Sequence, residues 1–255
     1  MKKILVIYAA HFINDFSLSQ YYKLKNELPE GYDIVWWLDD NYDGNLIDGI
    51  EFIRFPHHTI KSVFKYWFNP MKYMETYYTK NESFRNYDYY WIVEYDVYFN
   101  GNWKYFFETV DKYDEDLVCS ALTMYKCDSY IEFFGEKSFY DYFDKIFKSY
   151  ISIYRISNKA LKTIIDYNDC DIKKYLYEVY IPTILYKKGL SFLSLNKERY
   201  IISDNHLYDY SIDFQNYYDD TCFIDDAVND FWYDKIFTHK SQMNKQNKLY
   251  TRYKK

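Results

Sequence analysis

Residues 87–103, which read YDYYWIVEYDVYFNGNW, decide the fold. An aromatic and β-branched apolar run, typical of a buried strand, leads here into Glu94 and Asp96, with one residue between the two acids. Burying a charge without a partner is costly, so these carboxylates either emerge at the solvent end of the strand or hold something positive. Asn102 follows, and asparagine is a residue type that caps the N-termini of helices.

Expected strands and helices alternate on both sides of this segment. Short apolar runs predict strands over 2–10, 32–40, 50–55, 87–99, 116–122, 150–157 and 190–195. Helical spacing and capping residues predict helices over 17–28, 59–68, 103–113, 158–167 and 179–188, with Ser157 capping the fourth and Gly189 ending the fifth. This order predicts an α/β fold with a mostly parallel sheet flanked by helices. There is no repeat or linker, so we expect a single domain over 1–255 with an irregular C-terminal region.

Composition narrows the function classes. Hydrophobic residues make up 49% of the 255 residues, enough for a sizeable core. The 35 tyrosines are either platforms for flat ligands or a bias of the genome, and their wide scatter favours the bias for most of them. A net charge of -6, without a Lys/Arg-rich run interleaved with aromatics, argues against nucleic acid as a partner. The four cysteines show neither CxxC nor metal-finger spacing.

The two ends of the chain bear on its location. The first apolar run, ILVIYAA, is too short for a signal peptide or a membrane span, so we expect a cytoplasmic protein. Residues 241–255 form a basic tail. This tail is either a solvated chain end or a weak peripheral contact with the anionic inner face of a membrane.

Acidic residues end two of the expected strands. Asp39 and Asp40 close the second strand, as Glu94 and Asp96 close the fourth. Strand ends are often polar, but in parallel sheets ligands bind beyond the carboxyl ends of the strands. Acids at two such ends favour a cation or polyol site, and carboxylate oxygens suit Mg²⁺ or Mn²⁺, which also bridge nucleotide phosphates.

The loop after the first strand lies at the same expected edge of the sheet. There Ala9 and Ala10 leave room for a base, and His11 is placed to contact a nucleotide. The sequence contains no P-loop, no GxGxxG and no GxSxG, which argues against those phosphate-binding loops and against an esterase elbow. A glycosidase pair of carboxylates is compatible with the spacing, although the α/β order fits a nucleotide-binding sheet better.

The opening segment resembles the metal-binding strand end of GT-A-type glycosyltransferases, in which an aromatic strand is followed by two acids and a Gly-Asn-Trp helix start. ILVIYAAH, YRIS with NKAL, and YEVYIPTIL are also similar to this family, the last to branching N-acetylglucosaminyltransferase-like enzymes. These pieces span roughly residues 1 to 195. The first acid is Glu94, where the family usually has aspartate, and this departure leaves metal dependence open.

The resemblance implies a GT-A-like fold and a hexosyl- or N-acetylhexosaminyltransferase. The donor would be a nucleotide-diphosphate sugar, with a UDP-sugar expected, and the acceptor a saccharide hydroxyl in a surface glycan such as capsule or lipopolysaccharide. It further implies a nucleotide-binding half over 1–100 and an acceptor-binding half over 101–240. The implied roles are Asp96, Glu94 and His239 for Mn²⁺ or Mg²⁺; Ala9, Ala10, His11, Asp39, Asp40, Tyr95 and Lys240 for the nucleotide; Tyr154 and Arg155 for the sugars; and Glu178 as the base of an inverting reaction.

Each of these roles has a plainer alternative. Pro182 is comfortable only in the first turn of a helix, which places Glu178 at a helix N-terminus, where simple charge complementarity also explains a carboxylate. His239 is otherwise a surface histidine, and Arg155 an ordinary salt-bridged strand residue. The alternative functions are a sugar nucleotidyltransferase, which would need a basic glycine-rich N-terminal loop, and a non-catalytic carbohydrate-binding protein.

Overall fold

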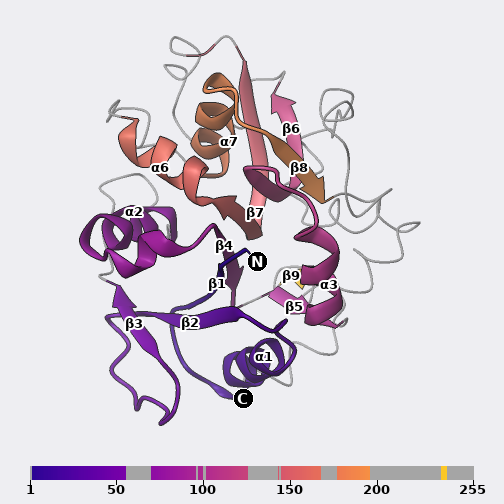
Figure 1. The fold of residues 1–255 in the computed structure, drawn as a ribbon. Helices are drawn as coiled ribbons and strands as arrows, with labels where there is room; N and C mark the ends of the chain where they lie inside the picture. Colours follow the sequence, from indigo (N-terminus) through magenta and orange to yellow (C-terminus); the bar gives the residue numbers. More distant parts are fainter. Residues whose placement is uncertain are drawn as a thin grey trace.

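The computed structural model describes residues 2–55, 70–95, 97–99, 102–125, 143, 145–167, 177–195 and 237–239. Its main sheet has seven strands in the order β3-β2-β1-β4-β7-β6-β8 (Figure 1). The strands are β1 (Ile4–Ala10), β2 (Tyr32–Asp39), β3 (Phe52–Phe55), β4 (Tyr89–Glu94), β6 (Leu117–Tyr125), β7 (Ile146–Ser157) and β8 (Phe192–Leu195). Only β7 runs antiparallel to its neighbours; every other pair in this sheet is parallel. The expected α/β fold class, a mostly parallel sheet flanked by helices, is confirmed.

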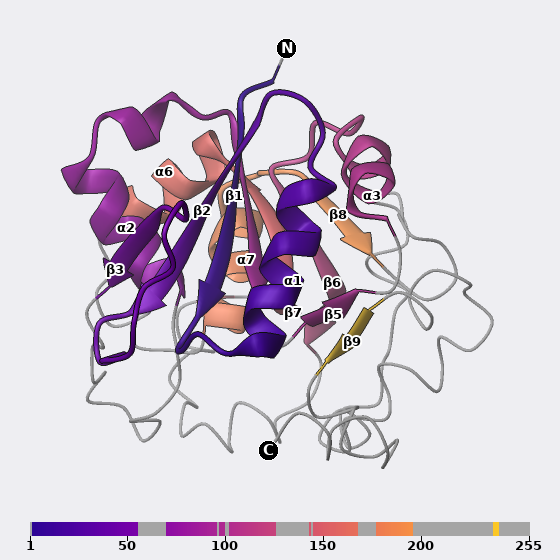
Figure 2. The ribbon, with the colours of Figure 1, turned by 90° about the horizontal axis from the view of Figure 1, so that it is seen from below.

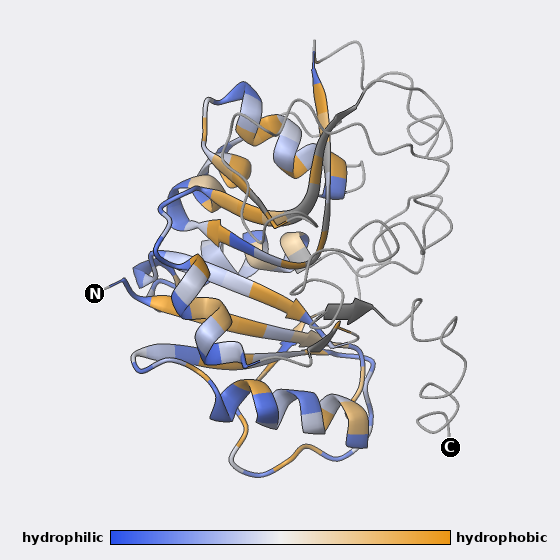
Figure 3. Cartoon of the chain, turned by 90° about the vertical axis from the view of Figure 1, so that its right-hand side faces the viewer, coloured by the Kyte–Doolittle hydropathy of each residue, from blue (hydrophilic) through white to orange (hydrophobic). Residues whose placement is uncertain are grey.

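A second, two-stranded sheet pairs β5 (Val97–Phe99) with β9 (Phe237–His239). The helices are α1 (Asp15–Asn26), α2 (Pro70–Lys80), α3 (Trp103–Val110), α6 (Asn158–Asp166) and α7 (Tyr177–Lys187), with a 3-10 turn, η1 (Ser83–Asn86), before β4. In Figure 3 the helices carry both hydrophilic and hydrophobic residues, as helices with one buried face do.

The helices cover both faces of the main sheet. Side chains of α2, α6 and α7 pack into one core with alternate residues of the strands, such as Ile7, Trp37 and Ile92. The intervening strand residues pack into a second core with α1 and α3. This alternation follows from the strand period of two. The same alternation shows on which face of the sheet the acids at the ends of β2 and β4 lie.

The local signals in the sequence behave as expected. The Asn102 side chain accepts the N–H of Tyr105 at 2.9 Å and starts α3, and Ser157 accepts the N–H of Ala160 at 3.0 Å and starts α6. Gly189 follows α7 with φ +71°, a conformation that favours glycine. The ends of these helices are therefore set by residues close to them in sequence.

Three expectations about elements need correction. Residues 87–99 form two strands in two different sheets, β4 and β5, rather than one. Helix α7 begins at Tyr177, two residues before the expected start, so Pro182 lies inside it and has no N–H to donate to the carbonyl four residues earlier. Helix α2 and strand β9 were not expected. The helix expected over 59–68 lies outside the described residues.

Helix α7 is enclosed on most sides by the core, with eight buried residues in its 11. Thr183 anchors it to β7, because its hydroxyl accepts the N–H of Phe147 at 2.9 Å and donates to the carbonyl of the same residue at 3.0 Å. Its apolar character therefore serves the core. Within the described part of the chain, no helix combines the length and the apolar character that crossing a membrane requires.

A buried carboxylate ties α3 to the amino edge of the sheet. Asp111, at the C-terminus of α3, accepts hydrogen bonds from Arg155 of β7 at 2.5 Å, from the Tyr32 hydroxyl of β2 at 2.6 Å and from Trp91 Nε1 of β4 at 3.2 Å. The Arg155 guanidinium also donates to the carbonyls of Tyr113 and Glu115. Three strands and one helix thus share one charged centre.

Neutralising this carboxylate will destabilise the fold. In Asp111→Asn the size of the side chain is kept, but the Arg155 guanidinium, which cannot lose its proton, is left buried without its counter-charge. We expect a loss of about 3 to 5 kcal/mol in the free energy of unfolding, measured by urea denaturation. Lys162→Ala, which breaks the exposed Lys162–Asp166 pair of α6, is the matched control and should change stability little. Equal effects of the two variants would contradict the structural role of Asp111.

A buried tyrosine makes stability sensitive to alkaline pH. Burial raises the pKa of the Tyr21 phenol to about 12, with smaller contributions from Tyr22 and Glu51. Because the folded-state pKa is the higher one, this stabilisation is fully present below pH 10 and is lost as pH rises through 12. Between these values Tyr21→Phe should gain on the wild type by up to about 1.4 kcal/mol per pH unit. The measurement is the free energy of unfolding of the two proteins in urea across this pH range.

Candidate functional site

The acids at the ends of β2 and β4 lie at one edge of the sheet. Glu94 is paired in register with Ala9 of β1, and Asp39 follows Leu38, which is paired with Ala10. In Figure 2, β1 and β8 point towards the side of the molecule on which β5 and β9 also lie. Asp39 and Glu94 come two residues after Trp37 and Ile92, which face the core formed with α7, so both carboxylates are on that same face of the sheet. Acids that are 55 residues apart in sequence therefore lie on one face at one edge.

The first residues of α7 reach this edge. The Tyr177 hydroxyl donates a hydrogen bond to Glu94 Oε1 at 3.2 Å. Burial raises the pKa of the Tyr177 phenol well above its ordinary range, and the carboxylates of Glu94 and Glu178 raise it further. The Tyr177–Glu94 hydrogen bond joins the end of β4 to the first turn of α7, and we call the place where Glu94 and Glu178 lie on the two joined elements the acidic centre. Glu178 is half-buried and lies in that first turn.

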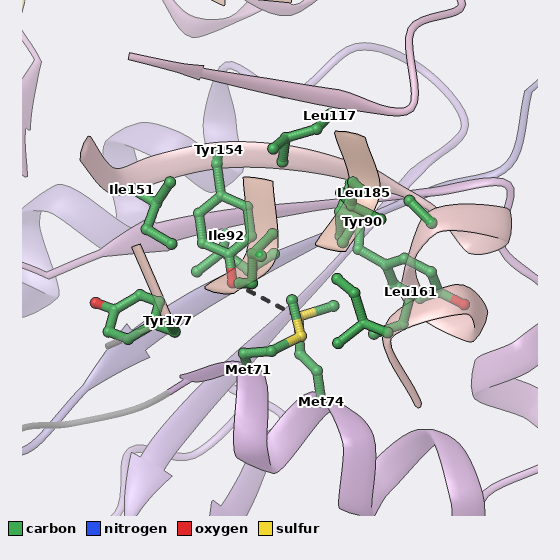
Figure 4. Close-up of a cluster of buried hydrophobic side chains, with 14 of the residues drawn as sticks. Met71, Met74, Tyr90, Ile92, Leu117, Ile151, Tyr154, Leu161, Tyr177 and Leu185 are labelled. Atoms are coloured by element: carbon green, nitrogen blue, oxygen red, sulfur yellow. Dashed lines mark hydrogen bonds between the residues drawn. The ribbon is translucent and has the colours of Figure 1, made fainter. Parts of the chain in front are cut away.

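A hydrophobic core lies directly beneath this centre. Tyr154 of β7 is fully buried, and its hydroxyl contacts Met74 Sδ at 3.9 Å (Figure 4). Burial raises the pKa of this phenol well above its ordinary range, and Glu94 is the second cause. Tyr154 was expected to contact a sugar. The structure places it inside the core, close to the acidic centre but with its ring packed among apolar side chains, which corrects that expectation.

Arg155 lies at the opposite edge of the sheet. Its side chain is 0% exposed, and its guanidinium is taken up by Asp111 and by the carbonyls that follow α3. The expectation that it faces a bound sugar is wrong, and the alternative, a salt-bridged strand residue, describes it. The physical reason is that β7 is antiparallel, so its last residues lie at the amino edge of the neighbouring strands.

The second part of the candidate site joins the ends of β1 and β2. His11 Nδ1 lies 3.3 Å from Asp39 Oδ2, and the Asp39 side chain is only 5% exposed. Asp39 Oδ1 also accepts the N–H of Asn41 at 2.9 Å. Three residues after His11, a reciprocal cap begins α1, in which Asn14 and Ser17 exchange hydrogen bonds. The pair brings an imidazole and a carboxylate together where the sequence predicted a nucleotide.

The other expected nucleotide residues divide into two groups. Tyr95 follows Glu94, its N–H donates to the carbonyl of Ala9 at 2.9 Å, and its ring meets the His11 ring edge to face at 5.8 Å. Asp40 is exposed beside Asp39. Ala9 and Ala10, by contrast, are each 1% exposed and lie inside the sheet, so their methyl groups pack in the core rather than facing an open edge.

The small sheet carries a late segment of the chain to the acid motif. Val97 of β5 is paired with His239 of β9, so the backbone of His239 lies opposite the residue that follows Asp96. The sequence separates these positions by 142 residues, and β9 is too short for a strand signal. Asp96, Lys240 and the side chain of His239 lie outside the described residues.

The donor chemistry of the acidic centre fits a hard divalent cation. Glu94 and Glu178 offer carboxylate oxygens, which Mg²⁺ and Mn²⁺ prefer. Among the residues that the structure describes, however, no group of three His, Cys, Asp or Glu side chains gathers closely enough to hold a metal ion. A metal held by three such side chains at this edge would thus need a further ligand, and strand pairing brings the backbone of His239 opposite Val97.

Sequence reasoning missed the residue that connects the acids. Tyr177 directly precedes Glu178, yet nothing distinguished it among 35 tyrosines. The only feature of the sequence that could have singled out Tyr177 is its position next to Glu178, the expected base. Its contact with Glu94 joins positions 83 residues apart and depends on how α7 packs against the sheet.

No protein-family model and no curated protein matches this chain. Among solved structures, a Bacillus anthracis protein in complex with sucrose, provisionally named a glucose-1-phosphate thymidylyltransferase, is similar at 12% identity and a TM-score of 0.46 over 74% of this chain and 85% of that one. A glycosyltransferase involved in glycosylation of the major capsid of PBCV-1 is similar at 12% identity and 0.42 over 92% and 94%. HddC from Yersinia pseudotuberculosis is similar at 15% identity and 0.40 over 75% and 89%. Likeness at this level carries no information about the reaction.

Proposed function

We propose that this protein is a glycosyltransferase that moves a sugar from a nucleotide-diphosphate donor, such as a UDP-sugar, to a saccharide hydroxyl. One observation carries the proposal: Glu94 at the end of β4 accepts a hydrogen bond from Tyr177, the residue that directly precedes Glu178 at the start of α7, on the edge of the sheet where Asp39 and His11 also pair. A binding place for a nucleotide, a counter-charge for a diphosphate and a base are the three parts that this reaction needs.

The nucleotide would bind beside the ends of β1 and β2. The His11–Asp39 pair fixes the imidazole for a hydrogen bond to the base or ribose, and the exposed Asp40 lies next to it. The Tyr95 ring, set against His11, offers a flat surface near the same place. We assign these four residues to the nucleotide.

A divalent metal would be held by Asp96 and Glu94, with His239 as a further ligand and Lys240 beside the phosphates. When bound, such an ion neutralises the charge that develops on the departing diphosphate. The pairing of Val97 with His239 supports this assignment, because it brings the late histidine to the acid motif.

Glu178 is assigned as the general base. The acceptor hydroxyl transfers its proton to the Glu178 carboxylate while its oxygen bonds to the anomeric carbon, and the bond from that carbon to the diphosphate oxygen breaks with its electron pair. The configuration inverts. The N-terminus of α7 favours the ionised carboxylate, the form that accepts a proton.

The acceptor and the location complete the proposal. A saccharide hydroxyl in a growing surface glycan, capsule or lipopolysaccharide, suits a cytoplasmic enzyme at the inner face of a membrane. The basic residues 241–255 would then contribute a weak electrostatic contact with anionic lipid.

A thermal-shift screen of nucleotide sugars, with and without Mn²⁺, tests the donor. A ligand that binds only the folded protein stabilises it by about 2.7 kcal/mol at one hundred times its dissociation constant, so the true donor should raise the melting temperature clearly. Asp96→Ala should remove the Mn²⁺-dependent part of that shift and the turnover, while leaving the melting temperature without ligand unchanged.

Two other outcomes of the screen would point elsewhere. Stabilisation by nucleoside triphosphates in place of nucleotide-diphosphate sugars would favour a nucleotidyltransferase. Stabilisation by free saccharides alone, unaffected by Asp96→Ala, would favour a carbohydrate-binding protein.

Glu178→Gln tests the base. The amide cannot accept the proton, so we expect turnover to fall by about 10² to 10⁴-fold while the donor is still bound. Asp15→Asn is the matched control, because Asp15 is the first-turn acid of α1 and has the same relation to its helix dipole. Both variants should lose a little stability, about 0.3 to 1 kcal/mol, but only Glu178→Gln should lose turnover. Full activity of Glu178→Gln would exclude the role of general base and leave Glu178 only the role of complementing the positive end of the α7 helix dipole.

A further inference from the structure

Glu94 has a hydrogen-bond partner on a different element. The Tyr177 hydroxyl donates to Glu94 Oε1 at 3.2 Å, from the first residue of α7 to the last residue of β4. Tyr177 itself is 8% exposed, whereas Glu94 is half-buried at the edge of the sheet. A nearly buried donor therefore holds an acid that lies closer to the solvent.

The phenol is held by rigid neighbours. Its ring belongs to the core shown in Figure 4, with Met74 of α2, Ile151 and Tyr154 of β7 and Ile92 of β4. Helix α7 is in turn fixed to β7 by the two hydrogen bonds between Thr183 and Phe147. Because both the ring and its helix are packed, the hydroxyl can hold a carboxylate in one orientation.

From this geometry we propose that Tyr177 is a positioning residue, which holds the Glu94 carboxylate in the orientation that the bound donor requires. Because Tyr177 and Glu178 are adjacent in the first turn of α7, the same hydrogen bond also fixes where Glu94 lies relative to Glu178. The inference rests on the proposed function and deepens it. It assigns to Tyr177 no contact with substrate; Tyr177 acts through Glu94.

The physical reason lies in the freedom of a carboxylate. The last torsion of a glutamate side chain is broad, so packing alone does not set the direction of its oxygens. One hydrogen bond from a fixed donor does. In enzymes a misplacement of about 1 Å can cost about a hundredfold in rate, and removing an outer partner of a metal ligand costs about 10 to 100-fold in metal affinity.

The neighbouring Tyr154 provides a matched control. It lies in the same core, and its hydroxyl contacts Met74 Sδ rather than Glu94. Tyr154→Phe and Tyr177→Phe each remove one buried hydroxyl and keep the ring. If Tyr177 served only the core, the two variants would behave alike.

The experiment compares Tyr177→Phe, Tyr154→Phe, Glu94→Gln and the double variant Glu94→Gln/Tyr177→Phe. Two properties are measured: the Mn²⁺ concentration that gives half of the stabilisation by UDP, and kcat with the donor found in the screen. We expect Tyr177→Phe to melt close to Tyr154→Phe, but to need about 10 to 100-fold more Mn²⁺ or to lose kcat by a similar factor. The double variant should be no worse than Glu94→Gln, because Tyr177 acts through that carboxylate.

Each contrary result has a distinct meaning. Wild-type behaviour of Tyr177→Phe in both measurements, or losses that add fully in the double variant, would overturn the positioning role and leave the proposed function intact. A wild-type chain that is neither stabilised by UDP or nucleotide sugars nor active with them would overturn the proposed function and the positioning role together.

Discussion

The Asp111 carboxylate is the interaction on which the arrangement of this sheet depends. It lies buried at the amino edge, where it accepts hydrogen bonds from Arg155, Tyr32 and Trp91 and so joins β7, β2 and β4 to the end of α3. A buried ion pair adds little stability by itself, but losing one partner is costly. It therefore constrains β7 to lie beside β4 with Arg155 at this edge, and that register sets Tyr154 beneath Glu94.

The acids at the two edges of the sheet have different kinds of hydrogen-bond partner. At the amino edge, Asp116 bonds to Ser157 and to the N–H of Ser191 across three strands, much as Asp111 does, so these acids serve the fold. At the carboxyl edge, Glu94 accepts its hydrogen bond from the Tyr177 hydroxyl, and Glu178 follows Tyr177 in the first turn of α7. Proteins commonly depart from the local rules of charge pairing at their functional sites. The cation of the proposed function would offset the negative charge of these carboxylates.

Much of the fold followed from short-range signals, and part of the candidate site did too. The acids of β2 and β4 were expected at one edge because carboxyl ends of parallel strands meet there, and the structure places Asp39 and Glu94 in that way. The adjacent Tyr154 and Arg155 failed as sugar contacts. Their segment reads as a strand in either direction, and only pairing with β4 shows that it is antiparallel. The antiparallel direction places Arg155 at the amino edge, whereas Tyr154 is no sugar contact because its ring is packed in the core.

The sequence by itself determined many of the elements and the chemistry available to them: apolar runs predicted strands, Asn102 and Ser157 began helices, and Glu94, Asp96 and Glu178 supplied carboxylates. These follow from interactions between residues close in the chain. Only the tertiary structure decided that β4 and β5 belong to different sheets, that His239 lies opposite Val97, and that Tyr177 holds Glu94. Those contacts join distant positions, and core packing and strand register select them, which no local pattern encodes.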